Sequence, residues 1–137
     1  MFTAITPTER RWLLTRSIGV LVLASLPYLV GALAAGPDRV FSGLQVNPLD
    51  GLSYLAKMQI GYHGDWLFSL RYTSEVGSGS FVYTYLISLG HLARVLGWPV
   101  ISVFHVARAL GGFALLWAIY ALVARVIHPI VQRRQAW

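Results

Sequence analysis

The side chains best able to do chemistry lie in the longest polar stretch of an otherwise apolar chain. Asp50 follows Asn47-Pro48 at the expected start of a short helix, and His63 and Asp65 come later in the same stretch. A helix N-terminus favours an ionised carboxylate. In that state Asp50 could bind a divalent cation through oxygen or act as a general base toward an acceptor hydroxyl. Asp50 is therefore the candidate catalytic and metal-binding residue, with Asp65 and His63 as assisting groups.

Each of these residues also has a structural interpretation. Asp50 could simply stabilise the first turn of its helix, by about 0.3 to 1 kcal/mol. Asp65 could cap the turn that follows it, and His63 could be an ordinary interfacial residue. The sequence contains no HExxH, P-loop, GxGxxG or GxSxG motif and no cysteine. Generic catalytic signatures and thiolate chemistry are therefore excluded.

Two arginines inside apolar segments, Arg94 and Arg108, are candidates of a second kind. A charge within a membrane span is costly and usually faces protein, water or a lipid phosphate. The functional interpretation is contact with the phosphate of a lipid carrier. The structural alternative is that each guanidinium extends along its aliphatic stem to the membrane interface.

The composition indicates a membrane protein. Of 137 residues, 56% are hydrophobic and only 12% are charged, too few for the solvated surface of a soluble domain. The formal net charge is +6, but the basic residues are scattered or stand at the ends of apolar segments. Anionic lipid headgroups, rather than nucleic acid, are therefore the expected counter-charge.

The sequence predicts an all-α integral membrane protein with three transmembrane helices and a long first extracytoplasmic loop that contains a short amphipathic juxtamembrane helix. The predicted segments are an N-terminal tail at 1–17, a span at 18–35, the loop at 36–80 with its interfacial helix at 48–60, a span at 81–96, a span at 99–124 and a basic tail at 125–137. A signal peptide is the alternative for the first apolar segment, although that segment is longer than a usual apolar region of such a peptide.

The arginines before the first span and those after the third span bear on the orientation in the membrane. Arg10, Arg11 and Arg16 precede the first span and predict a cytoplasmic N-terminus, in a bacterial inner membrane. Three spans then place the arginines of residues 125–137 outside the cell, against the positive-inside rule. Because the first span usually dominates, the cytoplasmic N-terminus is the predicted orientation, and the conflict is the one expected if the C-terminus is a cut end.

The polar stretch has a specific resemblance. Asp50-Gly51-Leu52-Ser53-Tyr54-Leu55-Ala56-Lys57-Met58, followed by Gly64-Asp65-Trp66-Leu67, resembles the first extracytoplasmic loop of GT-C fold glycosyltransferases, in particular the bacterial polyprenyl-phosphate-dependent group related to protein O-mannosyltransferases and aminoarabinose transferases. Residues 107–116, continuing to Ala124-Arg125, are similar to the third span of that family. Many members carry a second acid where this chain has Gly51.

The resemblance implies transfer of a sugar from a polyprenyl-phosphate-linked donor, with Asp50 organising the acceptor or a divalent cation and Arg94 and Arg108 near the lipid phosphate. Family members have many more spans, so this chain is not expected to be active alone and would require the missing C-terminal transferase helices. The alternative is a non-enzymatic small transmembrane subunit that packs against a larger membrane complex through Gly90, Gly111 and Gly112. Membrane lipids are expected partners in both cases, and nucleic acid in neither.

Overall fold

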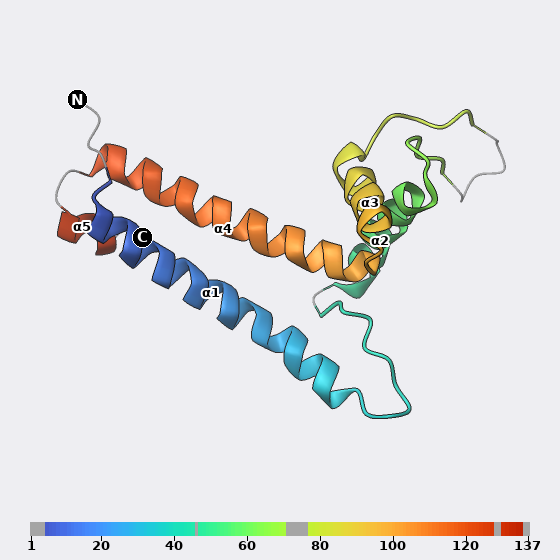
Figure 1. The fold of residues 1–137 in the computed structure, drawn as a ribbon, viewed down its shortest axis with the longest axis horizontal. Helices are drawn as coiled ribbons and strands as arrows, with labels where there is room; N and C mark the ends of the chain where they lie inside the picture. The colour runs from blue at the N-terminus through green and yellow to red at the C-terminus, as the bar shows by residue number, and fades with distance from the viewer. Residues whose placement is uncertain (1–4, 46, 71–76, 128–129, 136–137) are drawn as a thin grey trace. The chain divides into compact units, whose positions relative to one another are not determined.

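The computed structural model describes residues 5–45, 47–70, 77–127 and 130–135, so parts of the predicted tails and loop lie outside it. The described elements are helices, in the order α1 (Pro7–Ala34), α2 (Pro48–His63), α3 (Thr84–Leu96), α4 (Val100–Val126) and α5 (Ile130–Gln135) (Figure 1). Within these ranges the extended pairing consists of one antiparallel bridge between Phe68 and Ser80. The predicted all-helical class is confirmed. The chain forms two compact units, residues 1–29 with 108–137, and residues 30–107.

Helix α1 begins at Pro7, well before the predicted start of the first span at residue 18. The reason is a capping box. The backbone N–H and hydroxyl of Thr6 donate to Glu9 Oε2 at 2.8 and 2.9 Å, and the Glu9 backbone N–H donates to Thr6 Oγ1 at 3.2 Å. Pro7 takes the first helical position, where its missing N–H costs nothing. The arginines assigned to the N-terminal tail therefore lie on the first turns of α1.

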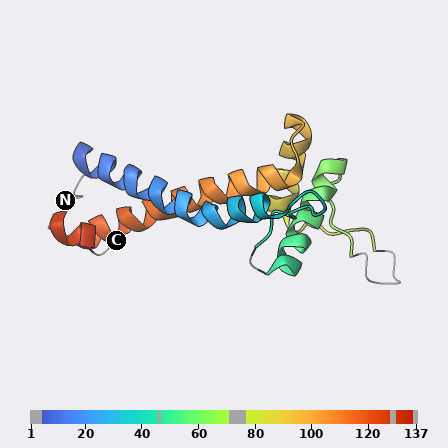
Figure 2. The ribbon, with the colours of Figure 1, turned by 90° about the horizontal axis from the view of Figure 1, so that it is seen from below.

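In the first unit, α1 and α4 run in opposite directions, as Figures 1 and 2 both show. Three pairings occur in reverse order along the two helices: Leu13 with Tyr120, Leu21 with Gly112, and Tyr28 with Arg108. The beginning of α1 therefore lies beside the end of α4.

Two of the described helices, α1 and α4, are long and apolar enough to cross a membrane. Their 28 and 27 residues correspond to about 42 and 40 Å, against roughly 30 Å of hydrocarbon. Large apolar side chains stay exposed on both, including Leu23 at 66%, Leu33 at 77% and Leu122 at 62%. Helices with so many exposed apolar side chains are unlike the buried core helices of soluble proteins.

The predicted middle span at 81–96 corresponds to α3, which has 13 residues. At about 20 Å this helix is shorter than the hydrocarbon layer. It starts only at Thr84, because Tyr83 adopts a left-handed conformation with φ 56° and leaves residues 81 and 82 outside the helix. The described residues thus contain two candidate spans where the sequence predicts three.

In the second unit, α2 and α3 pack with their backbones in direct contact at two glycines. A Cβ atom at Gly61 would overlap the carbonyl oxygen of Ile87, and one at Gly90 would overlap that of Met58. The side chains of Met58 and Ile87 are themselves fully buried. Glycine at both positions is therefore what allows the two helices to approach so closely.

This contact explains why α2 does not end where the sequence predicts. The predicted interfacial helix stops at residue 60 because Gly61 looks like a terminator, but the helix continues to His63. The terminator is Gly64, with φ 106°, and two backbone bonds complete a Schellman motif: Gly64 N–H to Gly61 O at 3.0 Å and Asp65 N–H to Ile60 O at 3.1 Å. Gly61 serves packing rather than termination.

We expect Gly90→Ala to destabilise the protein by about 1–3 kcal/mol, because its methyl group would push the backbones of α2 and α3 apart. The measurement is loss of helical circular dichroism during titration of the micelle-solubilised chain with sodium dodecyl sulfate. Gly111→Ala is the matched control, since a Cβ there meets nothing within 4 Å. Equal stability of the two variants would show that the close contact is not needed.

Candidate functional site

Asp50 lies in the first turn of α2, where its carboxylate is exposed and accepts a hydrogen bond from the Asn47 side-chain amide. Asn47 is held in a left-handed conformation, φ 47°, and its side chain turns to Asp50 instead of capping the helix. The carboxylate thus lies at the N-terminal end of the helix, with this amide as its hydrogen-bond donor. Asp50 is thus solvent-accessible and oriented, as a base or cation ligand must be.

The position after Asp50 carries no side chain, and adding one would require the Leu44 side chain to shift. Gly51 is buried, and a Cβ there would lie 2.7 Å from Leu44 Cδ2. Any side chain at this position would have to displace Leu44. The departure from the resembled family's second acid therefore has a structural counterpart, and Asp50 is the one carboxylate in the described first turn of α2.

The structure does not bring the assisting candidates to Asp50. His63 is the last residue of α2 and Asp65 follows its C-cap, so the helix separates both from Asp50 by about 20 Å. Both side chains are exposed. The Asp65 backbone N–H closes the Schellman motif of α2, a role the sequence did not suggest.

A second group of polar residues surrounds this far end of α2. Arg94 of α3 reaches the Gly64 turn, where its guanidinium occupies the space a Gly64 side chain would need. His91, one turn earlier, stacks on Trp66 with ring centroids 4.1 Å apart and an angle of 25°. His91 Nε2 is buried and has no hydrogen-bond partner among the residues that the structure describes. Arg94 is thus grouped with His63 and Asp65, not with Asp50.

His91 and Trp66 were not among the predicted site residues. The spacing of His91 and Arg94, three positions apart near the end of a helix, places them on one face and was the available signal. The stacking of Trp66 on that face depends on the loop between α2 and α3, whose path the sequence did not predict.

Arg108 belongs to the other unit, where its guanidinium carbon lies 4.2 Å from the centroid of the Tyr28 ring. This cation–π contact offsets part of the cost of a charge in an apolar segment. The Arg108 Nε is buried and makes no hydrogen bond to any described residue. Contact with Tyr28 is therefore the observed role of Arg108, and phosphate binding stays a prediction.

Within the described ranges, no group of three or more histidine and acidic side chains could hold a metal ion. Asp50 would offer a cation one carboxylate. Magnesium commonly binds to one or two carboxylates while substrate phosphates and water complete its shell. A cation at Asp50 would accordingly have to be shared with a phosphorylated substrate.

A fully buried carboxylate in the described part of the chain, Glu9, was not among the predicted site residues. Glu9 Oε1 accepts a hydrogen bond from the Tyr120 hydroxyl at 3.0 Å and from Arg133 Nη1 at 3.2 Å, while Oε2 completes the capping box with Thr6. Glu9 and Tyr120 are fully buried, and Arg133 is 2% exposed. Arg133 also donates through Nε to the Ile127 carbonyl. This Glu9–Tyr120–Arg133 network joins α1, α4 and α5.

Comparison of the chain with protein-family models, with curated proteins and with solved structures finds no match. The functional assignment therefore depends on the arrangement of the chain's own residues.

We expect Glu9→Gln to destabilise the first unit by about 1–3 kcal/mol, because it leaves the Arg133 charge buried without a counter-charge. The loss of stability is measured by titration with sodium dodecyl sulfate, with helix content followed by circular dichroism. The double variant Glu9→Gln, Arg133→Gln should lose less than the sum of the single losses, since the pair is coupled. Strict additivity would contradict a direct interaction.

Proposed function

We propose that the chain is an inner-membrane helical hairpin, crossing the bilayer through α1 and α4, whose connecting segment carries an acceptor-side loop of the GT-C glycosyltransferase type. The observation that supports the topology best is the Glu9–Tyr120–Arg133 network, because it holds the start of α1 beside the end of α4 and α5. A hairpin of two spans then places both ends of the chain on one side of the membrane.

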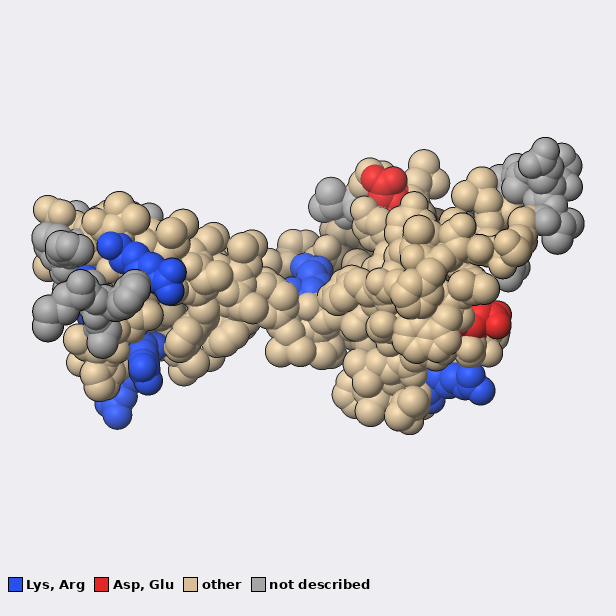
Figure 3. Space-filling view, turned by 90° about the horizontal axis from the view of Figure 1, so that it is seen from above, with Lys and Arg blue, Asp and Glu red and all other residues tan. Residues whose placement is uncertain are grey.

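The distribution of arginines supports this arrangement. Six of them lie at the paired ends of α1, α4 and α5: Arg10, Arg11, Arg16, Arg125, Arg133 and Arg134. Figure 3 shows basic side chains gathered over this end of the first unit. With two spans, all six fall on the cytoplasmic side and agree with the positive-inside rule. Three spans divide them between the two sides, which is the conflict found in the sequence.

The segment between the spans would then face the extracytoplasmic side, where polyprenyl-phosphate sugars are used by the resembled family. Asp50 is the proposed catalytic residue, taking a proton from the acceptor hydroxyl or orienting that hydroxyl. A divalent cation, where one takes part, would bridge Asp50 and the donor phosphate. Arg94 cannot contact the same phosphate, because about 20 Å of helix separates the two ends of α2.

Among the described residues, Arg94 and Arg108 do not lie beside Asp50, and one acid without a phosphate-binding group is an incomplete transferase site. We therefore assign the chain the acceptor side of the reaction and assign the donor-lipid contacts to further transferase helices. The second candidate, a non-enzymatic subunit of a membrane complex, is favoured by Gly111, which faces open space between the exposed Leu110 and Leu115. Gly90 does not support that candidate, since its contact with α2 occupies it.

Topology can be tested by cysteine labelling, because the natural chain contains no cysteine. A membrane-impermeant maleimide applied to intact cells should label Asp38→Cys, whereas Thr8→Cys and Gln132→Cys should react only after permeabilisation. Labelling of Gln132→Cys in intact cells would instead support three spans. Loss of the Thr8→Cys residue from the mature chain would show that the first segment is a signal peptide.

Catalysis can be tested with Asp50→Asn in the complete membrane assembly. We expect sugar transfer from a polyprenyl-phosphate donor to fall by about 10²–10⁴-fold, the usual contribution of a positioned general base. Asp38→Asn, which removes an exposed carboxylate from the same connecting segment, is the control and should retain transfer. Unchanged transfer by Asp50→Asn would exclude Asp50 from the chemistry and favour the non-enzymatic subunit.

A further inference from the structure

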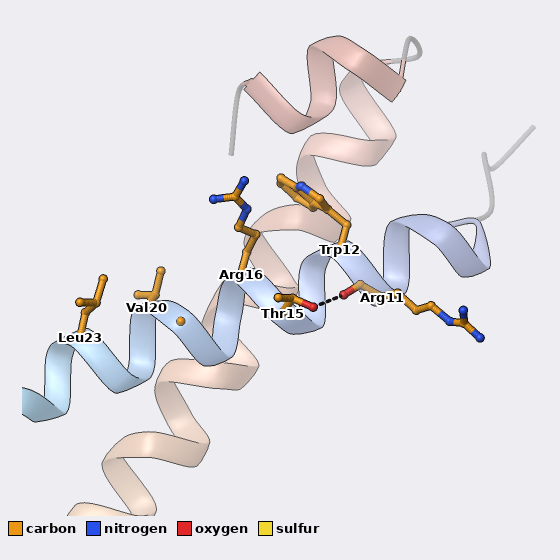
Figure 4. Close-up of a pocket in the computed structure, with 7 residues that line it drawn as sticks. Arg11, Trp12, Thr15, Arg16, Val20 and Leu23 are labelled. Carbon is orange, nitrogen blue, oxygen red and sulfur yellow. Dashed lines mark hydrogen bonds between the residues drawn. The ribbon is translucent and has the colours of Figure 1, made fainter.

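An open groove of about 590 Å³ runs along the first half of α1 (Figure 4). Two rows of residues spaced four apart line it, so they follow one side of the helix. The complete lining is Arg11, Trp12, Thr15, Arg16, Gly19, Val20 and Leu23. All seven belong to the first unit, and the groove changes from polar to apolar along the helix axis.

The polar end of the groove carries two positive charges and no acidic side chain. Figure 4 shows Arg16 and Trp12 rising from the same side of α1, while Arg11 extends toward the start of the helix. The Arg16 guanidinium carbon lies 5.9 Å from the Trp12 ring centroid. The nearest acid in sequence, Glu9, is already bonded to Arg133. The described residues thus provide no carboxylate to neutralise Arg11 and Arg16.

The opposite end of the groove is apolar and unfilled. Val20 and Leu23 are 44% and 66% exposed. A Cβ placed at Gly19 would meet nothing within 4 Å, so the groove stays open between the arginines and these two side chains. An amphiphile with a negative head and a hydrocarbon tail fits this order of residues, whereas a soluble anion would use only one end.

We propose that this groove binds one anionic phospholipid, with its phosphate at the polar end that Arg11, Trp12 and Arg16 line and an acyl chain over Gly19, Val20 and Leu23. Guanidinium groups bind phosphate oxygens through paired hydrogen bonds. Trp12 lies between the two arginines, at the headgroup depth where tryptophan collects. The proposal requires the membrane placement proposed above, but it is independent of any transferase activity.

Native mass spectrometry of the full chain in a non-ionic detergent tests the site. Phosphatidylglycerol and phosphatidylcholine with identical acyl chains are offered separately, and the lipids retained per chain are counted. We expect one phosphatidylglycerol to be retained at concentrations where phosphatidylcholine is lost. Equal retention of the two lipids, or displacement of phosphatidylglycerol by millimolar inorganic phosphate, would overturn the proposal.

Variants locate the binding. The pair Arg11→Gln, Arg16→Gln should weaken phosphatidylglycerol retention by about tenfold or more, because each basic residue near a headgroup contributes substantially to binding. Gly19→Leu should weaken it by filling the groove without a clash. Arg10→Gln removes the same charge from an exposed neighbouring position outside the groove and should retain the lipid.

Equal losses in Arg10→Gln and in the arginine pair would indicate a diffuse charge effect and overturn the site. Both arginines of the pair are exposed, so those variants should fold. Cysteine labelling measures membrane placement separately. A correctly oriented chain that retains no phosphatidylglycerol would therefore overturn the lipid site alone.

Discussion

The buried carboxylate of Glu9 is the interaction on which the arrangement of the first unit depends. One oxygen completes the capping box that starts α1, and the other accepts hydrogen bonds from Tyr120 and Arg133. A buried charge is tolerated only when it is paired and its lone pairs are bonded. Both conditions are met only when the end of α4 and α5 lie against the first turn of α1. The Glu9 carboxylate therefore determines where α1 starts and which helices pack against that start.

The second unit depends on a different constraint, the absence of side chains at Gly61 and Gly90. Backbone contact between α2 and α3 needs no charge and tolerates no methyl group. The same contact carries α2 past Gly61 to His63 and thereby separates Asp50 from Asp65. The spacing of the candidate site residues is thus a consequence of helix packing rather than of the chemistry they could perform.

Several features could be predicted from the sequence because they depend on local patterns. Apolar runs identified α1 and α4, and Asn47-Pro48 correctly marked the start of α2. Features that depend on distant contacts could not be predicted. Gly61 looks like a helix terminator until Ile87 is placed against it, and Glu9 looks like part of a polar tail until Tyr120 and Arg133 reach it. The Thr6-x-x-Glu9 capping box is the local signal for the start of α1.

In the candidate site, too, the features set by local sequence could be predicted and those set by distant contacts could not. The position of Asp50 in the first turn of α2 follows from local sequence, as does its exposure. The grouping of Arg94 with the Gly64 turn, and the stacking of His91 on Trp66, require the packing of α3 on α2 and the path of the loop between them. The positions of charges along the sequence did not indicate that Arg94 of α3 would reach the Gly64 turn, at the end of α2 opposite Asp50.

The Glu9–Arg133 pair also has a consequence for how the chain is made. Its two residues are 124 positions apart, so the carboxylate emerges from the ribosome long before the arginine that neutralises it. During that interval Glu9 must stay in water, which holds the start of α1 at the membrane surface while the apolar remainder enters the bilayer. The hydrogen bond between Arg133 and Glu9 then forms late in biogenesis. A nascent chain stalled before residue 133 would carry an inserted α1 that is not yet bonded to α5.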